Sequence, residues 1–315
     1  GSGVINDCCK VMAKAVQKPQ LVVGTAPSMD GYASTGAAMI TRGMKVTYPA
    51  ALPIAIVADT AVLAAAPMEM IQAGYGDIIG KYSALNDWKL SKCINDEYFC
   101  QYIYDMTYEQ ICRTLALAQG ILARDEQSIQ TLMEALVVIG IMMSFAGSSR
   151  PASGSEHHLS HFFEITGILN QTEYFPHGID VAYSTVITAK LREKILASEF
   201  PQKIYRPEKQ QYEACMRRIY QSSAEGCMAL QKKTGDYEKN RMPVYREKES
   251  QIRAILAEMP SAVRIEEMLA LVRLDINEFY SFYGTEKIRE AILYAKDLKD
   301  RYTVLWINYD FWGDL

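Results

Sequence analysis

The sequence predicts a short α/β segment followed by a mainly α-helical domain, and three observations support this fold class. Two β-branched runs, residues 21–23 and 54–57, are bounded by Gly, Pro or Asp, as buried strands are. Residues 5–17 have helical apolar spacing, and glycines stand directly before them. The rest of the chain has helical spacing nearly throughout. We therefore expect part of a nucleotide-binding, Rossmann-like α/β domain over residues 1–66 and an all-helical domain over residues 67–315.

The order of these elements also suggests what the chain contains of its first domain. A nucleotide-binding α/β domain normally has strands before its glycine turn, whereas this chain begins at the turn, Gly1-Ser2-Gly3. We expect the N-terminal half of that domain to be absent from this chain, either because the chain is a fragment or because the natural protein lacks that half.

The helical part divides into candidate helices separated by proline, glycine and serine signals. The signals are Arg150-Pro151 with Gly154, Phe200-Pro201, Arg206-Pro207 and Pro260-Ser261. The candidate helices cover residues 67–86, 108–123, 129–145, 156–167, 178–199, 209–234, 247–258, 262–273, 276–283 and 285–299.

Composition excludes several classes of protein. Of the 315 residues, 49% are hydrophobic and 22% are charged, which is typical of a globular chain. The net charge is -4 and no block of lysine or arginine stands out, so we expect no nucleic-acid partner. The longest apolar run, residues 135–147, is too short to span a bilayer. Seven cysteines without a C-x-x-C pair, and charges at Asp7 and Lys10 where a signal peptide would be apolar, favour the cytoplasm.

All four histidines of the chain fall in one short window: His157, His158, His161 and His177. The i, i+4 spacing of His157 and His161 places them on one face of a helix. The small polar residues before them are typical of a helix start. His177 follows Pro176 at the entry to the next helix, where an αα turn can bring it back to His157. Imidazoles grouped in this way favour a divalent transition metal.

A metal site of this kind needs a carboxylate, and Asp77 is the best candidate. It lies in an apolar helix, where a charge needs a partner or a metal, and the flanking Gly76 and Gly80 leave room around it. Glu164 and Asp87 are alternatives, and Asp77 could simply pair with Lys81. Two imidazoles and one carboxylate with an open position suit Lewis-acid catalysis.

Residues 25–34 form a second polar cluster directly after the first strand. Hydroxyls and a carboxylate at the carboxyl end of a strand lie where open α/β sheets bind ligands, although a simple turn has the same composition. Gly1-Ser2-Gly3 stands before a helix, where backbone N–H groups can receive a pyrophosphate.

Taken in order, these motifs resemble the sn-glycerol-1-phosphate dehydrogenase family, within the iron-type alcohol dehydrogenase and dehydroquinate synthase superfamily. The resemblance runs from the first residue to the last, and its longest pieces are specific. The matching pieces are GSGVINDCCK (1–10), TAPSMDGYAS (25–34), RGMK (42–45), AGYGDIIGKYSALNDW (73–88), SGSEHHLSHFFE (153–164), His177-Gly178 and DRYTVLWINYDFWGDL (300–315). The residues Ile179-Asp180 depart from the family, which often has Glu-Lys there.

The resemblance implies a dehydroquinate synthase-like fold and a set of site residues. Asp77, His157 and His177 would bind the metal, and Asp30, Asp77 and His161 would act on the substrate. The nucleotide would contact Gly1, Ser2, Gly3, Val4, Ile5, Thr25, Ala26, Pro27, Ser28 and Ser34. His161 would relay a proton to the substrate oxygen. Lys81, Lys45 and Arg150 are candidates for the cation that meets the substrate phosphate.

The implied activity is the interconversion of dihydroxyacetone phosphate and sn-glycerol 1-phosphate with NAD or NADP, a step of phospholipid metabolism. The implied metal is zinc, with nickel or iron as alternatives, and the implied partner is a small phosphorylated polyol; a homo-oligomer is compatible with the sequence. Two further hypotheses stay open: a glycerol dehydrogenase-like polyol oxidoreductase, and a non-catalytic homologue that acts as a helical scaffold or partner subunit. A closed structural metal site would need a fourth protein ligand, which the sequence does not offer.

Overall fold

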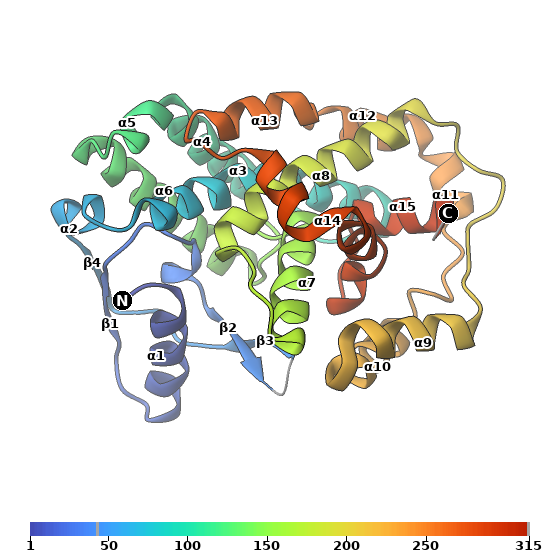
Figure 1. The fold of residues 1–315 in the computed structure, drawn as a ribbon, viewed down its shortest axis with the longest axis horizontal. Coiled ribbons are helices and arrows are strands. Elements are labelled where there is room, and N and C mark those ends of the chain that lie inside the picture. Colours follow the sequence, from blue (N-terminus) through green and yellow to red (C-terminus); the bar gives the residue numbers. More distant parts are fainter. Residues whose placement is uncertain (42–43, 314–315) are drawn as a thin grey trace.

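A computed structural model describes residues 1–41 and 44–313. It consists of a small α/β part at the N-terminus and a larger part built of helices (Figure 1). The α/β part contains α1 (Gly3–Ala15), β1 (Leu21–Gly24), the 3-10 helix η1 (Gly31–Ala33), β2 (Gly36–Thr41), β3 (Met44–Pro49), β4 (Ala55–Ala58) and α2 (Thr60–Ala64).

Parallel pairing of β1 with β4 confirms both strands expected from the β-branched runs. Leu21 lies opposite Ala55 and Gly24 opposite Ala58, so the second strand begins one residue later than expected. The expected first helix is α1, which begins two residues early and ends at Ala15. A parallel pair joined by a long connection is the pattern of an α/β domain.

The antiparallel hairpin of β2 and β3 was not predicted. Gly36 pairs with Pro49 and Thr41 with Met44. Its first strand opens with Gly36, Ala37 and Ala38, which are residue types with low strand propensity, so the sequence lacked the usual signal. Residues Arg42 and Gly43 of the expected motif RGMK lie outside the described residues.

The helical part follows in chain order, and its helices pack around α3 and α8. Its elements are α3 (Met68–Asn95), α4 (Gln101–Ala116), α5 (Ala118–Leu122), α6 (Glu126–Ala146), α7 (Ser155–Asn170), α8 (His177–Ala197), α9 (Lys209–Tyr220), η2 (Gln221–Ser223), α10 (Ala224–Thr234), α11 (Met242–Glu247), α12 (Glu249–Ala257), α13 (Ala262–Ala270), α14 (Ile276–Tyr294), η3 (Ala295–Leu298) and α15 (Val304–Trp312). The α3 helix contacts both α7 and α8 (Figure 1), and most of its side chains are buried.

Several expected helices differ from the observed ones in their limits. The helix expected over residues 209–234 is broken at Gln221, where φ is 45° and ψ is -117°. The expected break between residues 283 and 285 is confirmed as a kink at Gly284, where φ is 73°. The final helix, α15, was not predicted, because its run of aromatic and apolar residues has no polar face to give a helical period.

One helix, α6, is long and apolar enough to cross a membrane by length and composition alone. In this fold it packs against α4 and α2, and half of its most apolar stretch is buried. The core helix of a globular protein has the same properties.

Candidate metal centre

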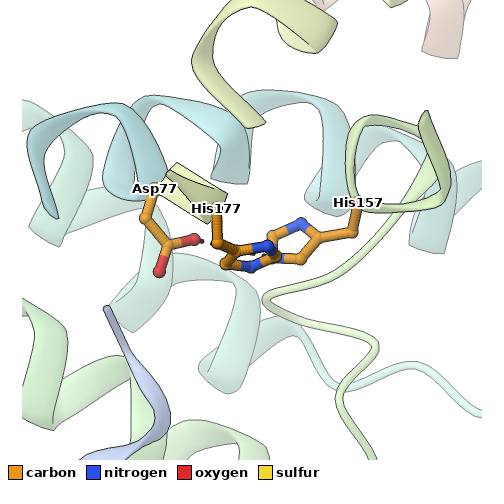
Figure 2. Close-up of side chains that lie close together, drawn as sticks. All are labelled: Asp77, His157 and His177. Atoms are coloured by element: carbon orange, nitrogen blue, oxygen red, sulfur yellow. Dashed lines mark ion pairs between the residues drawn. The ribbon is translucent and has the colours of Figure 1, made fainter. Parts of the chain in front are cut away.

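Asp77, His157 and His177 come together from three helices, α3, α7 and α8 (Figure 2). One ligand atom from each residue lies within 4.8 Å of the other two. The side chains point toward one another, and the Nε2 atom of His157 lies 3.5 Å from the Oδ1 atom of Asp77. Two imidazoles and a carboxylate at this separation are a donor set that fits a divalent transition metal.

Close contact between helices brings these residues together, and two glycines permit it. A Cβ atom on Gly178 would lie 2.0 Å from the carbonyl oxygen of Ala73, so α8 can approach α3 only without one. In the same way, a Cβ atom on Gly74 would lie 1.7 Å from the carbonyl oxygen of Pro27. The first contact places His177 beside Asp77, and the second holds the loop after β1 against the same helix.

The two histidine rings are held by hydrogen bonds on their Nδ1 atoms. The Nδ1 atom of His157 lies 2.7 Å from Oε1 of Glu156, and the Nδ1 atom of His177 lies 3.1 Å from Oγ of Ser160. Partners of this kind orient metal-binding imidazoles and leave Nε2 as the ligand atom. The sequence analysis missed Glu156 and Ser160, although both lie in the matched motif, and no rule of spacing marks them as ring-orienting residues.

A buried lysine lies between two carboxylates at the centre of the site. The Nζ atom of Lys81 lies 2.6 Å from Asp30 and 2.6 Å from Asp77. Burial and the nearby negative charge of Asp30 raise the pKa of Asp77 to about 7, against the opposing effect of Lys81. One lysine therefore faces two carboxylates in a buried place, and the surplus negative charge favours a bound cation.

The two carboxylates considered as alternatives to Asp77, those of Asp87 and Glu164, have different surroundings. Asp87 accepts hydrogen bonds from the backbone N–H groups of Ser155 and Val304 and pairs with Arg192, so it holds the helices together and does not face the histidines. Glu164 lies close to His161 and His177, and these three offer ligand atoms within 4.8 Å of one another. His177 is shared by both groups, so the two positions are neighbours.

The residues expected to act on the substrate lie at this centre. The backbone N–H of Asp30 donates to Oδ2 of Asp77 at 3.0 Å, which fixes the loop after β1 to α3. The ring of His161 lies beside that of His177, with centroids 5.3 Å apart. His158 shares the helix but not the face: its ring is fully buried, and burial followed by the charges of Lys299, Arg301 and Arg150 holds its pKa well below the usual range.

The residues expected to contact a nucleotide gather where α1 begins against the end of β1. The backbone nitrogen of Gly1 donates to the carbonyl oxygen of Val23 at 2.7 Å, and the Oγ atoms of Ser2 and Ser28 lie 2.6 Å apart. Thr25 is exposed, and residues 26–28 are buried. Ser34 lies apart from this group, since its carbonyl oxygen accepts from Lys10 and its hydroxyl donates to the backbone of residues 31 and 36.

Comparison with known proteins gives consistent similarities. A family model described as iron-containing alcohol dehydrogenase matches residues 1–67. The glycerol-1-phosphate dehydrogenase (NAD(P)+) of Bacillus licheniformis is 31% identical over 307 residues, which are 98% of this chain and 66% of that protein. The one from Halalkalibacterium halodurans is 40% identical over 191 residues, 61% of this chain and 48% of that protein. The chain thus spans about half to two thirds of the length of these curated relatives.

Solved structures share the fold. Maleylacetate reductase from a Rhizobium species matches with a TM-score of 0.55 at 14% identity, covering 99% of this chain and 73% of that one. A probable glycerol dehydrogenase from Sinorhizobium meliloti matches with a TM-score of 0.52 at 16% identity, covering 82% of this chain and 76% of that one. These matches confirm the expected fold class, a small α/β part followed by a helical part.

Proposed function

Because the chain belongs to the glycerol-1-phosphate dehydrogenase family, within the iron-type alcohol dehydrogenase superfamily, we propose that it carries the metal and substrate site of such an enzyme. The reaction would interconvert dihydroxyacetone phosphate and sn-glycerol 1-phosphate with NAD or NADP. The curated relatives are named for this activity. Residues 1–66 would belong to the nucleotide-binding domain, and residues 67–315 would form the domain that binds metal and substrate.

Asp77, His157 and His177 would hold the metal, which we propose to be zinc, with nickel or iron as alternatives. A divalent metal at this place would act as a Lewis acid and stabilise negative charge that develops on the substrate oxygen. The convergence of these three side chains from three helices is the observation that carries the proposal.

The other residues of the centre would position the substrate and its proton. Asp30, whose carboxylate is held by Lys81, would accept a hydrogen bond from a substrate hydroxyl. His161 would donate the proton to the substrate oxygen, since its ring lies beside the ligand His177 and its Nδ1 atom is 3.4 Å from Glu164. Glu156 and Ser160 would keep the two ligand rings in place.

The nicotinamide nucleotide would bind at the start of α1 and the end of β1. Backbone N–H groups of Gly1 to Ile5 open a helix, where the pyrophosphate of a dinucleotide gains most from the helix dipole. Thr25, Ala26, Pro27 and Ser28 line the loop that continues from this place to Asp30, so nucleotide and metal would meet on either side of the substrate. Ser34 is proposed on resemblance alone.

The test is a comparison of substrates in the longest gene product that contains this chain. We expect oxidation of NADH or NADPH with dihydroxyacetone phosphate, and a kcat/KM for free dihydroxyacetone that is lower by more than about tenfold, because a recognised phosphate contributes binding energy. Equal rates with both ketones would instead identify a glycerol dehydrogenase-like enzyme. If the protein binds metal but consumes neither ketone nor nucleotide, it is a non-catalytic homologue.

A further inference from the structure

A partly buried arginine, Arg301, lies beside the metal centre and forms no ion pair with a carboxylate among the described residues. The guanidinium of Arg301 donates to the carbonyl oxygen of Ser153 at 2.9 Å and to Oγ of Ser149 at 3.0 Å. Within residues 1–41 and 44–313, no carboxylate lies within ion-pair distance of it. Burial, and then the charge of Arg150, lower the pKa of Arg301 to about 10. A cation in such a place is stabilised by a bound anion. The described carboxylates whose charge reaches Arg301 are those of Asp300, Glu97 and Glu156, and none of them forms an ion pair with it.

Two further polar groups gather at the same place. Lys299 lies two residues before Arg301, in the segment between η3 and α15, with its Nζ atom 3.5 Å from Oγ of Ser153. His158 is fully buried beside them, and neither of its ring nitrogens has a hydrogen-bond partner in the part of the chain that the structure describes. Two carboxylates are near these cations in the sequence or the fold. Glu156 forms a hydrogen bond with His157, and Asp300 is exposed to solvent.

This group adjoins the metal centre through one short segment. Lys81, which bridges Asp30 and Asp77, donates to the carbonyl oxygen of Ala152 at 3.0 Å. Arg301 donates to the carbonyl oxygen of the next residue, Ser153. A three-carbon ketone phosphate has its carbonyl and its phosphate only a few bonds apart, so the phosphate must be received next to the metal centre.

The cations suggested by the sequence are committed elsewhere or not described. Lys81 is neutralised by Asp30 and Asp77. Arg150 is bound by Glu97 through two nitrogens, with Nε 2.6 Å from Oε1. The side chain of Lys45 lies outside the described residues. Arg301 was missed because an arginine in a polar loop between helices gives no signal in the sequence that it will lie beside the metal centre.

We propose that Arg301 and Lys299, with the ring of His158 behind them, bind the phosphate of the substrate. A planar guanidinium that can form two parallel hydrogen bonds, together with an ammonium, is the donor set that a phosphate monoester dianion prefers. The inference rests on the proposed function for the identity of the substrate, but the anion site itself does not depend on catalysis.

The first test measures binding of inorganic phosphate by titration calorimetry at constant ionic strength, with chloride as the reference anion. We expect wild-type protein to bind phosphate, and Arg301→Met and Lys299→Met each to weaken binding by about tenfold or more, because a hydrogen bond to a charged group contributes that much. Arg301→Lys should lose less than Arg301→Met. Arg264→Met, which removes an exposed arginine from α13, is the matched control and should bind as wild type does.

The second test separates this inference from the proposed activity. In active protein, Arg301→Met and Lys299→Met should raise KM for dihydroxyacetone phosphate, while kcat/KM for free dihydroxyacetone changes by less than about twofold. Active variants with an unchanged KM for the phosphate would overturn the phosphate site and leave the dehydrogenase intact. If the protein reduces neither ketone but still binds phosphate in a way that depends on Arg301, the proposed function is wrong and the anion site is kept. Since Lys299 is partly exposed, its variant remains informative if Arg301→Met fails to fold.

Discussion

At the scale of single residues, the candidate site is defined by charge that the protein does not balance locally. One buried ammonium, that of Lys81, faces the carboxylates of Asp30 and Asp77, so this point has surplus negative charge. The neighbouring guanidinium of Arg301 has no carboxylate partner among the described residues, so that point has surplus positive charge. A divalent cation and a substrate phosphate would offset the two imbalances separately.

Lys81 is the residue whose removal should expose this imbalance most clearly. Lys81→Met would leave the buried Asp77 and the partly buried Asp30 without their shared cation, and breaking a buried ion pair in this way costs about 3–5 kcal/mol. We expect that loss in the free energy of unfolding, measured in urea with metal removed by a chelator. The matched control is Lys89→Met, which breaks the more exposed pair with Glu258 and should cost about 0–1 kcal/mol. Similar losses for both variants would show that Lys81 does not neutralise the centre.

At the scale of elements, the site depends on how closely α8 approaches α3. Gly178 is the contact point, because a Cβ atom there would lie 2.0 Å from the backbone oxygen of Ala73. His177 precedes this glycine directly, so any separation of the helices moves a metal ligand away from Asp77. The loop before α7 is fixed in a similar way, since the N–H of Ser155 donates to Asp87 of α3 at 2.6 Å.

Gly178→Ala should therefore damage both the fold and the metal site. Overpacking at a contact this tight costs about 1–3 kcal/mol of unfolding free energy, and zinc affinity should fall because His177 is displaced. Gly3→Ala is the control. Gly3 lies in the first turn of α1, and a Cβ atom there would meet only Met29, at 3.9 Å. Zinc titration against a chromogenic chelator, together with urea unfolding, measures both effects. Unchanged zinc affinity in Gly178→Ala would mean that this contact does not set the position of His177.

The elements also show what the sequence could and could not predict. The parallel strands and most helices follow from β-branched runs, helical apolar spacing and proline or glycine stops, and the kink at Gly284 was expected at its position. The β2–β3 hairpin was missed because its first strand opens with glycine and alanines, and α15 was missed because its mostly aromatic and apolar sequence has no period that distinguishes its faces.

The same limit applies to the site. The grouping of four histidines and the match of longer motifs indicate Asp77, His157 and His177 from the sequence alone. The pair of Asp77 with Lys81, one turn apart on α3, was named as an alternative and is present, but the other partners of these residues were not predictable. Contacts such as Lys81 with Asp30, or Arg301 with Ser153, join residues far apart in the chain, and only the packing of helices decides them.

At the scale of the whole molecule, the chain combines two parts with different chemistry around one site. The start of α1 and the end of β1 offer backbone N–H groups and hydroxyls, while α3, α7 and α8 supply imidazoles and carboxylates. The loop from Thr25 to Asp30 connects them, since it leaves β1 and reaches Asp77 through the N–H of Asp30. Such an arrangement would let a nucleotide and a metal approach a small substrate from opposite sides.

The most direct test of this account is the metal content of purified protein, measured by mass spectrometry of the bound elements, for wild type and His157→Ala. We expect close to one zinc, nickel or iron per wild-type chain and less than about a tenth of that in the variant, because a site with three protein ligands rarely survives the loss of one. In His157→Ala, the rate of dihydroxyacetone phosphate reduction should fall together with the metal content, by more than about a hundredfold, since a Lewis acid contributes several kcal/mol to transition-state stabilisation. Asp105→Asn, at an exposed position on α4, should change neither quantity. A His157→Ala protein that keeps its metal and its activity would contradict the assignment of the metal centre.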